Sequence, residues 1–316
     1  MTGTTGFIGS LLLERLAASG EHEIFTLQRA STARGEMPAA NMAKTVFADL
    51  LDASAVKEAV RESQPEVVFH LAGVSAVAYG YEHPGEMLQA NFTGTVNLAE
   101  SCRSRAHGLP HFLFASTAAV YGNAPVPMRE ETPQAPSNPY GVSKLAAEKY
   151  LRYMQVAYRF PVTLLRPFNT FGRRDHANFF VERTITQMLT GDTVKLGDPT
   201  PVRDWLYAAD HVDAYIACFE HPEKSIGESF NFCSGTTVTV RDLAEKLRAM
   251  TGFEGQILWD TFPRRPLDIQ VLQGDASKAK SFLGWAPKVS LDEGLRRTID
   301  FWRKKLAATN ELAARS

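Results

Sequence analysis

The sequence Gly3-Thr4-Thr5-Gly6-Phe7-Ile8-Gly9 stands almost at the start of the chain and leads directly into the amphipathic run Leu11-Leu12-Leu13-x-x-Leu16. Glycines at this spacing let a backbone approach a pyrophosphate, and the N-terminus of the helix that follows supplies unpaired N–H groups. Alone, the motif would also suit a tight turn without a ligand. An apolar strand normally precedes such a loop, but only Met1 and Thr2 stand before it here. We expect the natural chain to carry this first strand upstream, because deleting a central strand would unpair two neighbouring ladders.

After this loop, short apolar runs alternate with longer helical patterns. Such an alternation predicts a parallel sheet covered by helices on both faces. We therefore expect a Rossmann-type, doubly wound α/β domain over residues 1–166. Residues 167–316 should form a smaller, mixed α/β substrate lobe, with some segments returning to the main sheet. The expected strands are Ile24–Leu27, Val46–Ala48, Val67–His70, Phe112–Ala115 and Val162–Arg166, and the expected helices are Gly9–Ala18, Ser54–Ser63, Gly85–Ser104, Tyr140–Tyr158, Val212–Phe219, Val240–Met250, Asp275–Leu283 and Leu291–Trp302.

Composition narrows the kind of ligand. A net charge of -1 over 316 residues gives no single-sign field that would attract nucleic acid or an anionic membrane. No run approaches the roughly 18 apolar residues that can span a bilayer, so we expect a cytoplasmic protein. The three cysteines, Cys102, Cys218 and Cys233, are scattered, which argues against a disulfide framework and against a metal site. These features favour an enzyme for small molecules.

Tyr140-Gly-Val-Ser-Lys144 lies at the start of a predicted helix. The i, i+4 spacing places the phenol and the ammonium group on one face, so Lys144 can lower the pKa of Tyr140. A tyrosine tuned in this way can act as a general acid or base near neutral pH. The alternative is an exposed helical pair without a catalytic role.

Ser116-Thr117-Ala118-Ala119 follows the predicted strand Phe112–Ala115. This places hydroxyl groups at the carboxyl edge of a parallel sheet, where ligands of open α/β sheets bind. Thr117 could therefore hydrogen-bond a reacting oxygen beside Tyr140. It could also merely cap the turn that follows the strand.

Together these motifs resemble the extended short-chain dehydrogenases/reductases, and the resemblance spans nearly the whole chain. It continues through His70-Leu-Ala-Gly73, Asn91-x-x-Gly94-Thr95 and Arg166-Pro-Phe-Asn169. The C-terminal half is most similar to GDP-mannose 4,6-dehydratases and GDP-4-keto-6-deoxymannose reductases, through Arg203-Asp-Trp and Arg265-Pro-x-Asp268. The resemblance implies catalytic roles for Thr117, Tyr140 and Lys144. It further implies cofactor contacts at Gly3, Thr5, Gly6, Phe7, Ile8, Gly9, Asp49, Leu50, Leu71, Ala72, Gly73, Asn91, Tyr140 and Lys144, and sugar-nucleotide contacts at Ser116, Asn169, Val181, Arg203 and Arg265, with the two arginines at the diphosphate.

The end of the second predicted strand bears on the choice of cofactor. Enzymes that prefer NAD usually end this strand with an acidic residue that holds the ribose 2′-hydroxyl, whereas a nearby arginine accommodates a 2′-phosphate. Here the chain reads Leu27-Gln28-Arg29-Ala30-Ser31, without an acid. Arg29 therefore favours NADP(H), while NAD(H) stays possible if this arginine only stacks on adenine.

The reaction can be narrowed by one departure from the dehydratases. Those enzymes typically carry a glutamate just after the strand-end threonine, where this chain has Ala118 and Ala119. We therefore expect an NADPH-dependent 4-ketoreductase of a nucleotide-linked 4-keto-6-deoxyhexose, with GDP as the favoured nucleotide. A 4-epimerase with tightly bound NAD, a 4,6-dehydratase and a non-catalytic dinucleotide sensor are the alternatives. The resemblance also implies a homodimer in which Gly85–Ser104 and Tyr140–Tyr158 pair with their symmetry mates in a four-helix interface.

Overall fold

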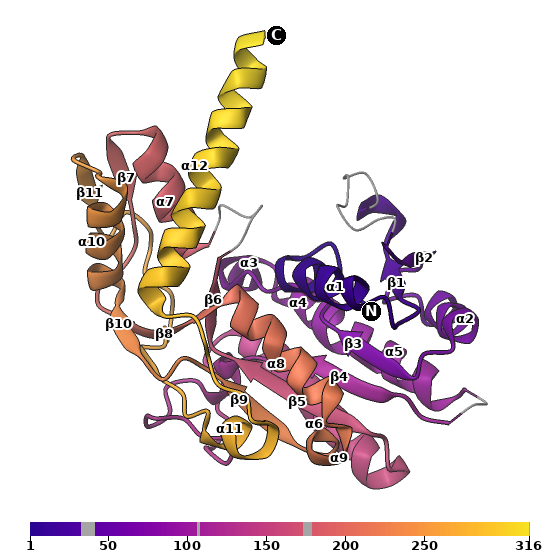
Figure 1. Cartoon of the computed structure of the whole chain (residues 1–316). Coiled ribbons are helices and arrows are strands. Elements are labelled where there is room, and N and C mark those ends of the chain that lie inside the picture. Colours follow the sequence, from indigo (N-terminus) through magenta and orange to yellow (C-terminus); the bar gives the residue numbers. More distant parts are fainter. Residues whose placement is uncertain (33–41, 106–107, 173–178, 316) are drawn as a thin grey trace.

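A parallel sheet forms the centre of the molecule (Figure 1). The computed structural model describes residues 1–32, 42–105, 108–172 and 179–315. All strand pairs of this sheet are parallel. The Rossmann-type doubly wound fold expected from the sequence is thereby confirmed. The strands are β2 (Lys44–Phe47), β1 (Phe25–Gln28), β3 (Val67–His70), β4 (His111–Ala115), β5 (Val162–Pro167) and β9 (Ser229–Phe232), in that spatial order.

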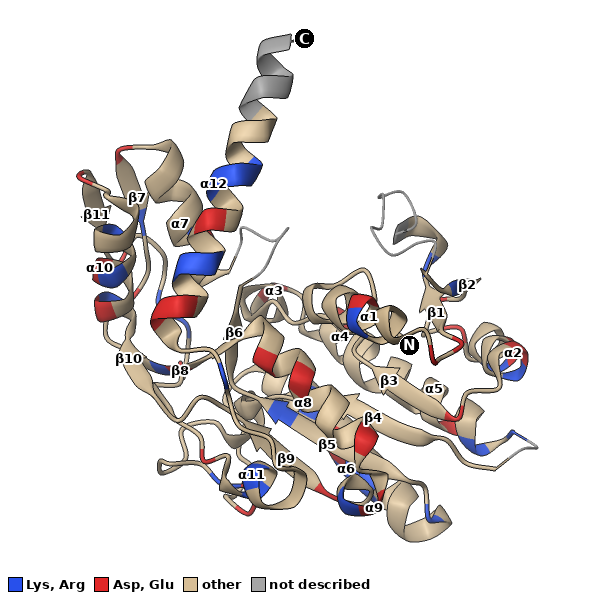
Figure 2. Cartoon of the chain, viewed as in Figure 1, with Lys and Arg blue, Asp and Glu red and all other residues tan. Residues whose placement is uncertain are grey.

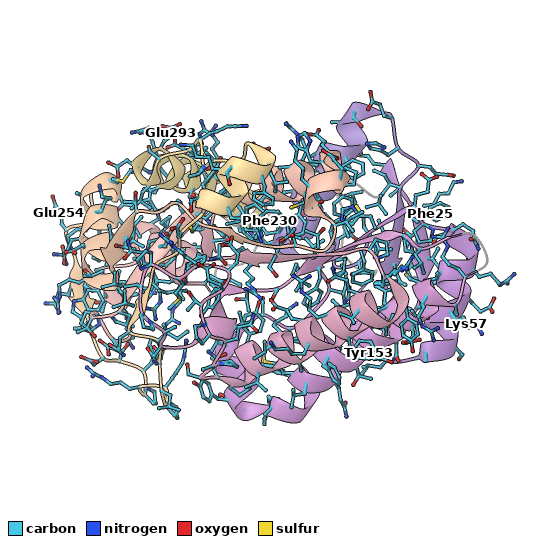
Figure 3. All side chains as sticks on the ribbon, turned by 90° about the horizontal axis from the view of Figure 1, so that it is seen from below. Phe25, Lys57, Tyr153, Phe230, Glu254 and Glu293 are labelled. Carbon is cyan, nitrogen blue, oxygen red and sulfur yellow. The ribbon has the colours of Figure 1, made fainter. Side chains whose placement is uncertain are left out.

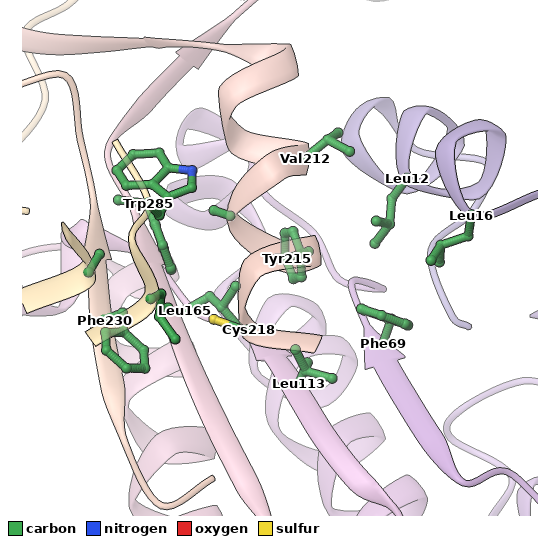
Figure 4. Packing of buried hydrophobic residues seen from close by; sticks show 14 of the residues in the cluster. Leu12, Leu16, Phe69, Leu113, Leu165, Val212, Tyr215, Cys218, Phe230 and Trp285 are labelled. Atoms are coloured by element: carbon green, nitrogen blue, oxygen red, sulfur yellow. The ribbon is translucent and has the colours of Figure 1, made fainter. Parts of the chain in front are cut away.

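Helices cover both faces of the sheet because successive strand residues point to opposite sides. In β4, Leu113 packs against one set of helices, whereas Phe112 and Phe114 pack against the other. In the view of Figure 4, Leu12 and Tyr215 lie above the strand residues of the first face. The first set comprises α1 (Phe7–Ser19), α8 (Ala208–Glu220) and α11 (Ser277–Leu283), and the second comprises α2 (Ala53–Ser63), α5 (Gly94–Arg103) and α6 (Pro139–Tyr158).

The segment predicted as one helix over Gly85–Ser104 is more complex. It begins as α4 (Pro84–Leu88), widens into a π-helical turn over Gln89–Thr93, and continues as α5. A short helix, α3 (Val77–Glu82), precedes it. The π-helical turn contains Asn91, which is buried.

The second lobe is built around β8 (Val202–Tyr207), which pairs with β6, β10 and β12. Its separate core contains Phe171, Trp205, Leu295 and Trp302. The strand β9 leaves this part of the chain and completes the main sheet beside β5. The remaining elements are β6 (Asn169–Phe171), β7 (Thr193–Lys195), β10 (Thr237–Thr239), β11 (Gln256–Leu258), β12 (Val271–Leu272), α7 (Phe180–Thr190), α9 (Pro222–Ser225), α10 (Val240–Thr251), α12 (Leu291–Arg315) and two 3-10 turns at Ala30–Thr32 and Ala118–Tyr121.

Between β1 and β3 the main sheet holds only a short stub of chain. Thr2 bridges both strands in parallel: its N–H donates to Phe69 O over 2.9 Å, and the N–H of Leu27 donates to Met1 O over 2.8 Å. Beyond this stub lies a cavity of about 610 Å³, lined by apolar residues such as Ile24 and Val68 and by polar residues such as Glu23 and Glu62.

The surface carries charges of both signs side by side, as along α10 and α12 in Figure 2. Among the described residues, no helix is both long and apolar enough to cross a membrane. The three cysteines are all buried and unpaired with one another. Burial raises the pKa of the Cys102 thiol to about 12, so this thiol is protonated at neutral pH.

Candidate active site

The glycine loop joins the stub of the first strand to α1. Gly3 has φ of +75°, and a Cβ there would lie 2.5 Å from Ala72 N, so the loop packs directly on the end of β3. A Cβ at Gly9 would overlap the carbonyl oxygen of Gly3. The helix then begins at Phe7 without a side-chain cap and without an acidic residue in its first turn. This leaves its N-terminal dipole suited to an anion.

A cavity of about 250 Å³ lies beside this loop, at the carboxyl ends of the neighbouring strands. It brings together residues from five separate segments of the sequence: the glycine loop, the ends of β1, β2 and β3, and Ala90 in the π-helical turn. Asp49 lines it with its side chain held by the Leu51 N–H at 2.9 Å. Its wall includes the predicted cofactor residues Gly3, Thr5, Gly6, Arg29, Asp49, Leu50, Leu71, Ala72 and Gly73.

Tyr140 sits in the first turn of α6. This helix begins there because Asn138 caps it, with Oδ1 accepting the Gly141 N–H at 2.8 Å, and because Pro139 occupies the first helical position. Tyr140 is half-buried. Lys144, one turn later, is only 4% exposed, and its Nζ donates to Ala115 O at 2.7 Å. Burial lowers the pKa of Lys144 to about 8, against the opposing effect of Glu148.

Thr117 comes two residues after the end of β4 and caps the 3-10 turn Ala118–Tyr121. Its Oγ1 accepts the Ala119 N–H at 3.1 Å, so its own hydrogen can be donated to a substrate oxygen. Gly141 packs against the same turn, since a Cβ there would lie 2.6 Å from Ala119 O. The structure thus brings the Thr117 turn and the Tyr140 helix into contact. Gly141 was not singled out from the sequence, although its small size between Tyr140 and Lys144 was the available signal.

Asn91 connects the end of β3 to this helix. Its Nδ2 donates to Ser143 Oγ at 2.9 Å, and its Oδ1 accepts the Val74 N–H at 2.7 Å. Gly73 fits tightly here, because a Cβ at this position would lie 2.6 Å from Asn91 Oδ1 and 3.4 Å from Lys144 Nζ. Any larger residue would displace the amide or the amine.

A chain of buried groups fixes the tautomer of His70. Thr95 Oγ1 donates to Asn91 O at 2.6 Å, so it accepts a hydrogen from His70 Nε2, 2.9 Å away. His70 Nδ1 is then the acceptor for Thr2 Oγ1 at 2.7 Å. Burial, with a smaller effect of Lys144, lowers the pKa of His70 to about 3. This neutral histidine, which the sequence predicted only as part of a motif, ties the glycine loop to the Asn91 turn.

The predicted sugar-nucleotide residues occupy different environments. Asn169 has a buried Oδ1 that lacks a hydrogen-bond partner among the described residues. Arg203 Nη2 lies 3.8 Å from Asp268 Oδ1, and burial lowers the pKa of Arg203, with the charge of Arg265 acting in the same direction. By contrast, the Val181 side chain packs in the core of the second lobe, and the Ser116 hydroxyl donates to Glu148 at 2.5 Å.

Comparisons with known proteins agree with this geometry. A sequence model of the GDP-mannose 4,6 dehydratase family matches residues 1–298. The chain is 33% identical to a UDP-glucose 4-epimerase from Mycolicibacterium smegmatis, covering 96% of this chain and 98% of that protein. It is 30% identical to a GDP-6-deoxy-D-mannose reductase from Pseudomonas aeruginosa, covering 97% of each.

Among solved structures, UDP-glucose 4-epimerase from Thermotoga maritima superposes with a TM-score of 0.88 at 32% identity, covering 96% of this chain and 98% of that one. Members of this family are NAD(P)-dependent epimerases, dehydratases and reductases that modify nucleotide sugars. The chain belongs to this family, the NAD(P)-dependent epimerase/dehydratase family of extended short-chain dehydrogenases/reductases.

Proposed function

We propose that this protein is an NADPH-dependent 4-ketoreductase of a nucleotide-linked 4-keto-6-deoxyhexose. The observation that carries the proposal is the end of β1, where Arg29 is exposed on the wall of the cofactor cavity. Gln28 beside it is buried and bonds Thr26 Oγ1 at 3.1 Å. A guanidinium group at this position suits a 2′-phosphate. An epimerase recycles its nicotinamide and gains nothing from selecting NADPH, so Arg29 favours a reductase.

The proposed reduction converts a carbonyl at C4 into a hydroxyl. NADPH, when bound, supplies the hydride that adds to this carbon. Tyr140 gives its phenolic proton to the oxygen, and the phenolate is reprotonated from solvent. Thr117 donates a hydrogen bond to the same oxygen, which polarises the carbonyl beforehand. Lys144 holds the nicotinamide ribose, and its ammonium group favours the phenolate.

The binding residues proposed for the two ligands occupy the two lobes. The cofactor would lie along the glycine loop, with its 2′-phosphate at Arg29 and its nicotinamide end near Gly73 and Asn91. The substrate would lie over Asn169, with its diphosphate at Arg203 and Arg265. GDP is the favoured nucleotide because of the similarity to GDP-mannose 4,6 dehydratases over residues 1–298. Ser116 and Val181 would reach the sugar only through backbone atoms, since their side chains are engaged elsewhere.

A specific observation favours a second candidate, a 4-epimerase. The matched relatives include UDP-glucose 4-epimerases, one of them 33% identical over nearly the full chain. The Thr117, Tyr140 and Lys144 arrangement serves both reactions. Retained cofactor separates them, because an epimerase keeps NAD tightly bound through its cycle, whereas a reductase exchanges its cofactor at each turnover.

The test follows NADPH absorbance with purified protein. We expect oxidation of NADPH with GDP-4-keto-6-deoxymannose, and none with GDP-mannose as the only sugar, because Ala118 and Ala119 cannot exchange protons during dehydration. NADH should serve more poorly than NADPH, and Arg29→Ala should reduce this preference. Interconversion of UDP-glucose and UDP-galactose, together with NAD retained in mass spectra, would replace the reductase assignment with the epimerase. A 4-keto product formed from GDP-mannose alone would instead identify a dehydratase.

We also propose a homodimer through α5 and α6. Val142, Tyr153 and Val156 recur on one side of α6 at helical spacing, and Val156 is 85% exposed. Tyr153 lies on the outer side of this helix in Figure 3. Burying these side chains against their symmetry mates would form a four-helix interface. Light scattering should give twice the mass of the chain, and Val156→Lys should give the monomer mass with unchanged secondary structure. A monomeric parent protein at micromolar concentration would contradict the dimer.

A further inference from the structure

We propose that the buried ion pair between Glu148 and Arg166 is a positioning pair for the active site. It locks the strand end that carries Thr117 against the helix that carries Tyr140 and Lys144, and it places a carboxyl group one helical turn from the lysine. This inference rests on the catalytic roles proposed above for these three residues.

The pair is buried and bidentate. Glu148 is 1% exposed and Arg166 is 4% exposed. Arg166 Nε donates to Glu148 Oε1 at 2.9 Å, and its Nη2 donates to Glu148 Oε2 at 2.7 Å. This fork geometry is the strongest form of the contact. Replacing a buried pair by apolar groups of similar volume is often neutral or stabilising, so overall stability alone is a weak reason for charges at this position.

The contacts of the pair lead directly to the candidate active site. Ser116, next to Thr117, donates its hydroxyl to Glu148 Oε1 at 2.5 Å. Arg166 Nη1 donates to the hydroxyl of Tyr121, which ends the 3-10 turn after Thr117, at 2.9 Å. The residue before Thr117 and the end of the turn after it are therefore both held by one ion pair.

The same network of hydrogen bonds extends to β9, the strand beside β5 in the main sheet. Tyr121 OH donates to Asn231 Oδ1 in β9 at 2.7 Å. The backbone N–H of Asn231 donates to Glu130 Oε1 at 2.7 Å, and Arg166 Nη1 donates to the carbonyl oxygen of Glu130 at 3.0 Å. Residues from α6, β5, β9 and the turn after β4 thus meet at one buried point, which fixes the distance between strand end and helix.

The charge of Glu148 also affects the protonation of Lys144. Glu148 follows Lys144 at i+4 on the same helix, so the two side chains are neighbours. Burial lowers the pKa of Lys144 to about 8, while Glu148 raises it. Other groups around Lys144 are His70 from β3, which stays neutral, and the Phe114 ring from β4, 4.8 Å from Nζ, while Tyr140 precedes Lys144 by four residues on the same helix. Neutralising Glu148 would leave the positive charge of Arg166 unpaired, which also disfavours the protonated lysine.

The test compares Glu148→Gln with the parent protein. We expect kcat to fall by about 10- to 100-fold with little change in KM for the cofactor, because the glutamine keeps the shape and loses the charge. The proton of Lys144 should be lost at a pH lower by about one unit, which moves the alkaline limb of the kcat profile in the same direction. NMR of isotopically labelled lysine gives this titration in the substrate-free protein. That readout stays valid even if the reductase proposal fails, and kcat is then measured with whichever nucleotide sugar the parent protein converts.

Two further variants separate positioning from stability. Asp210→Asn removes another buried carboxylate, which binds the backbone N–H groups of Lys288 and Val289. It should lower the melting temperature without moving the lysine titration. The double variant Glu148→Leu, Arg166→Met should have a melting temperature close to that of the parent protein. It should still show the low kcat and the shifted Lys144 titration expected for Glu148→Gln. A double variant with parental kcat and parental lysine titration would overturn the proposal and leave the pair a purely structural feature.

Discussion

Tyr140→Phe should reduce turnover by about 100- to 10,000-fold, the range expected when a general acid is lost, while cofactor affinity stays close to that of the parent protein. The phenol of Tyr140 is the proton donor of the proposed reduction, and it sits in the first turn of α6, beside the Thr117 turn on which Gly141 packs. Removing one hydroxyl leaves the glycine loop, Arg29 and Lys144 in place. Steady-state kinetics and cofactor titration by fluorescence measure the two quantities separately.

The matched control is Tyr150→Phe on the same helix. Tyr150 is half-buried, and its hydroxyl donates to Glu100 at 2.5 Å, away from the cofactor cavity. It loses the same atom without touching the site, so turnover should stay near the parental value. Near-normal turnover in Tyr140→Phe, or an equal loss in the control, would refute the role of Tyr140 as the proton donor.

An apolar β-type segment added before Met1 should raise the melting temperature by about 6 °C. Such a segment would extend the stub at Thr2 into the cavity between β1 and β3, each of which has four residues. A fully buried aliphatic side chain stabilises by about 1.5–3 kcal/mol, and ordering a residue costs about 1–2 kcal/mol. A net gain of roughly 1 kcal/mol for each of four residues gives a shift of this size.

The extension also converts the terminal amino group of Met1 into a peptide N–H group. The amino group of Met1 is buried, which lowers its pKa to about 6, and it donates to Phe25 O at 2.6 Å. In the extended chain this amine becomes an uncharged amide. Differential scanning calorimetry and NADPH titration should show higher stability and tighter binding, since the stub anchors the glycine loop. A Ser/Gly extension of equal length is the control, and an equal gain from it would show that the cavity does not accept a strand.

Much of the main sheet was predictable because β3, β4 and β5 are buried on both faces and bounded by polar turns. Val67–His70 has the same limits in sequence and structure, and the end of α6 at Tyr158 was also predicted. Periodicity did not reveal β7 and β11, since three-residue strands are too short to show an alternation. The helix expected from Asp275 begins at Ser277 instead, because the Asp275 side chain accepts the Ser277 N–H at 2.8 Å.

The candidate site was predictable where it depends on local spacing and not where it depends on partners distant in sequence. Tyr140, Lys144 and the glycine loop stand in short motifs, so their roles could be proposed directly. Ser116 was expected at the substrate, yet its hydroxyl bonds Glu148, 32 residues later in the chain. Nothing in the local sequence distinguishes Glu148 from a solvated helix residue. Only the fold shows that Arg166 meets it.

The π-helical turn at Gln89–Thr93 explains how one continuous helix can pack against two different helices. An α-helix turns by about 100° for each residue, so one extra residue in a turn rotates everything beyond it by about that angle. Here α4, before the turn, packs against α6, whereas α5, after it, packs mainly against α2. Such turns often occur at functional sites, and this one places Asn91 against Val74 and Ser143. Deleting a single residue would therefore leave a regular helix in which the apolar face of α5 no longer points toward α2. The extra residue thus sets the rotation of α5 relative to α4, so that one segment contacts the active-site helix α6 and the other contacts the outer helix α2.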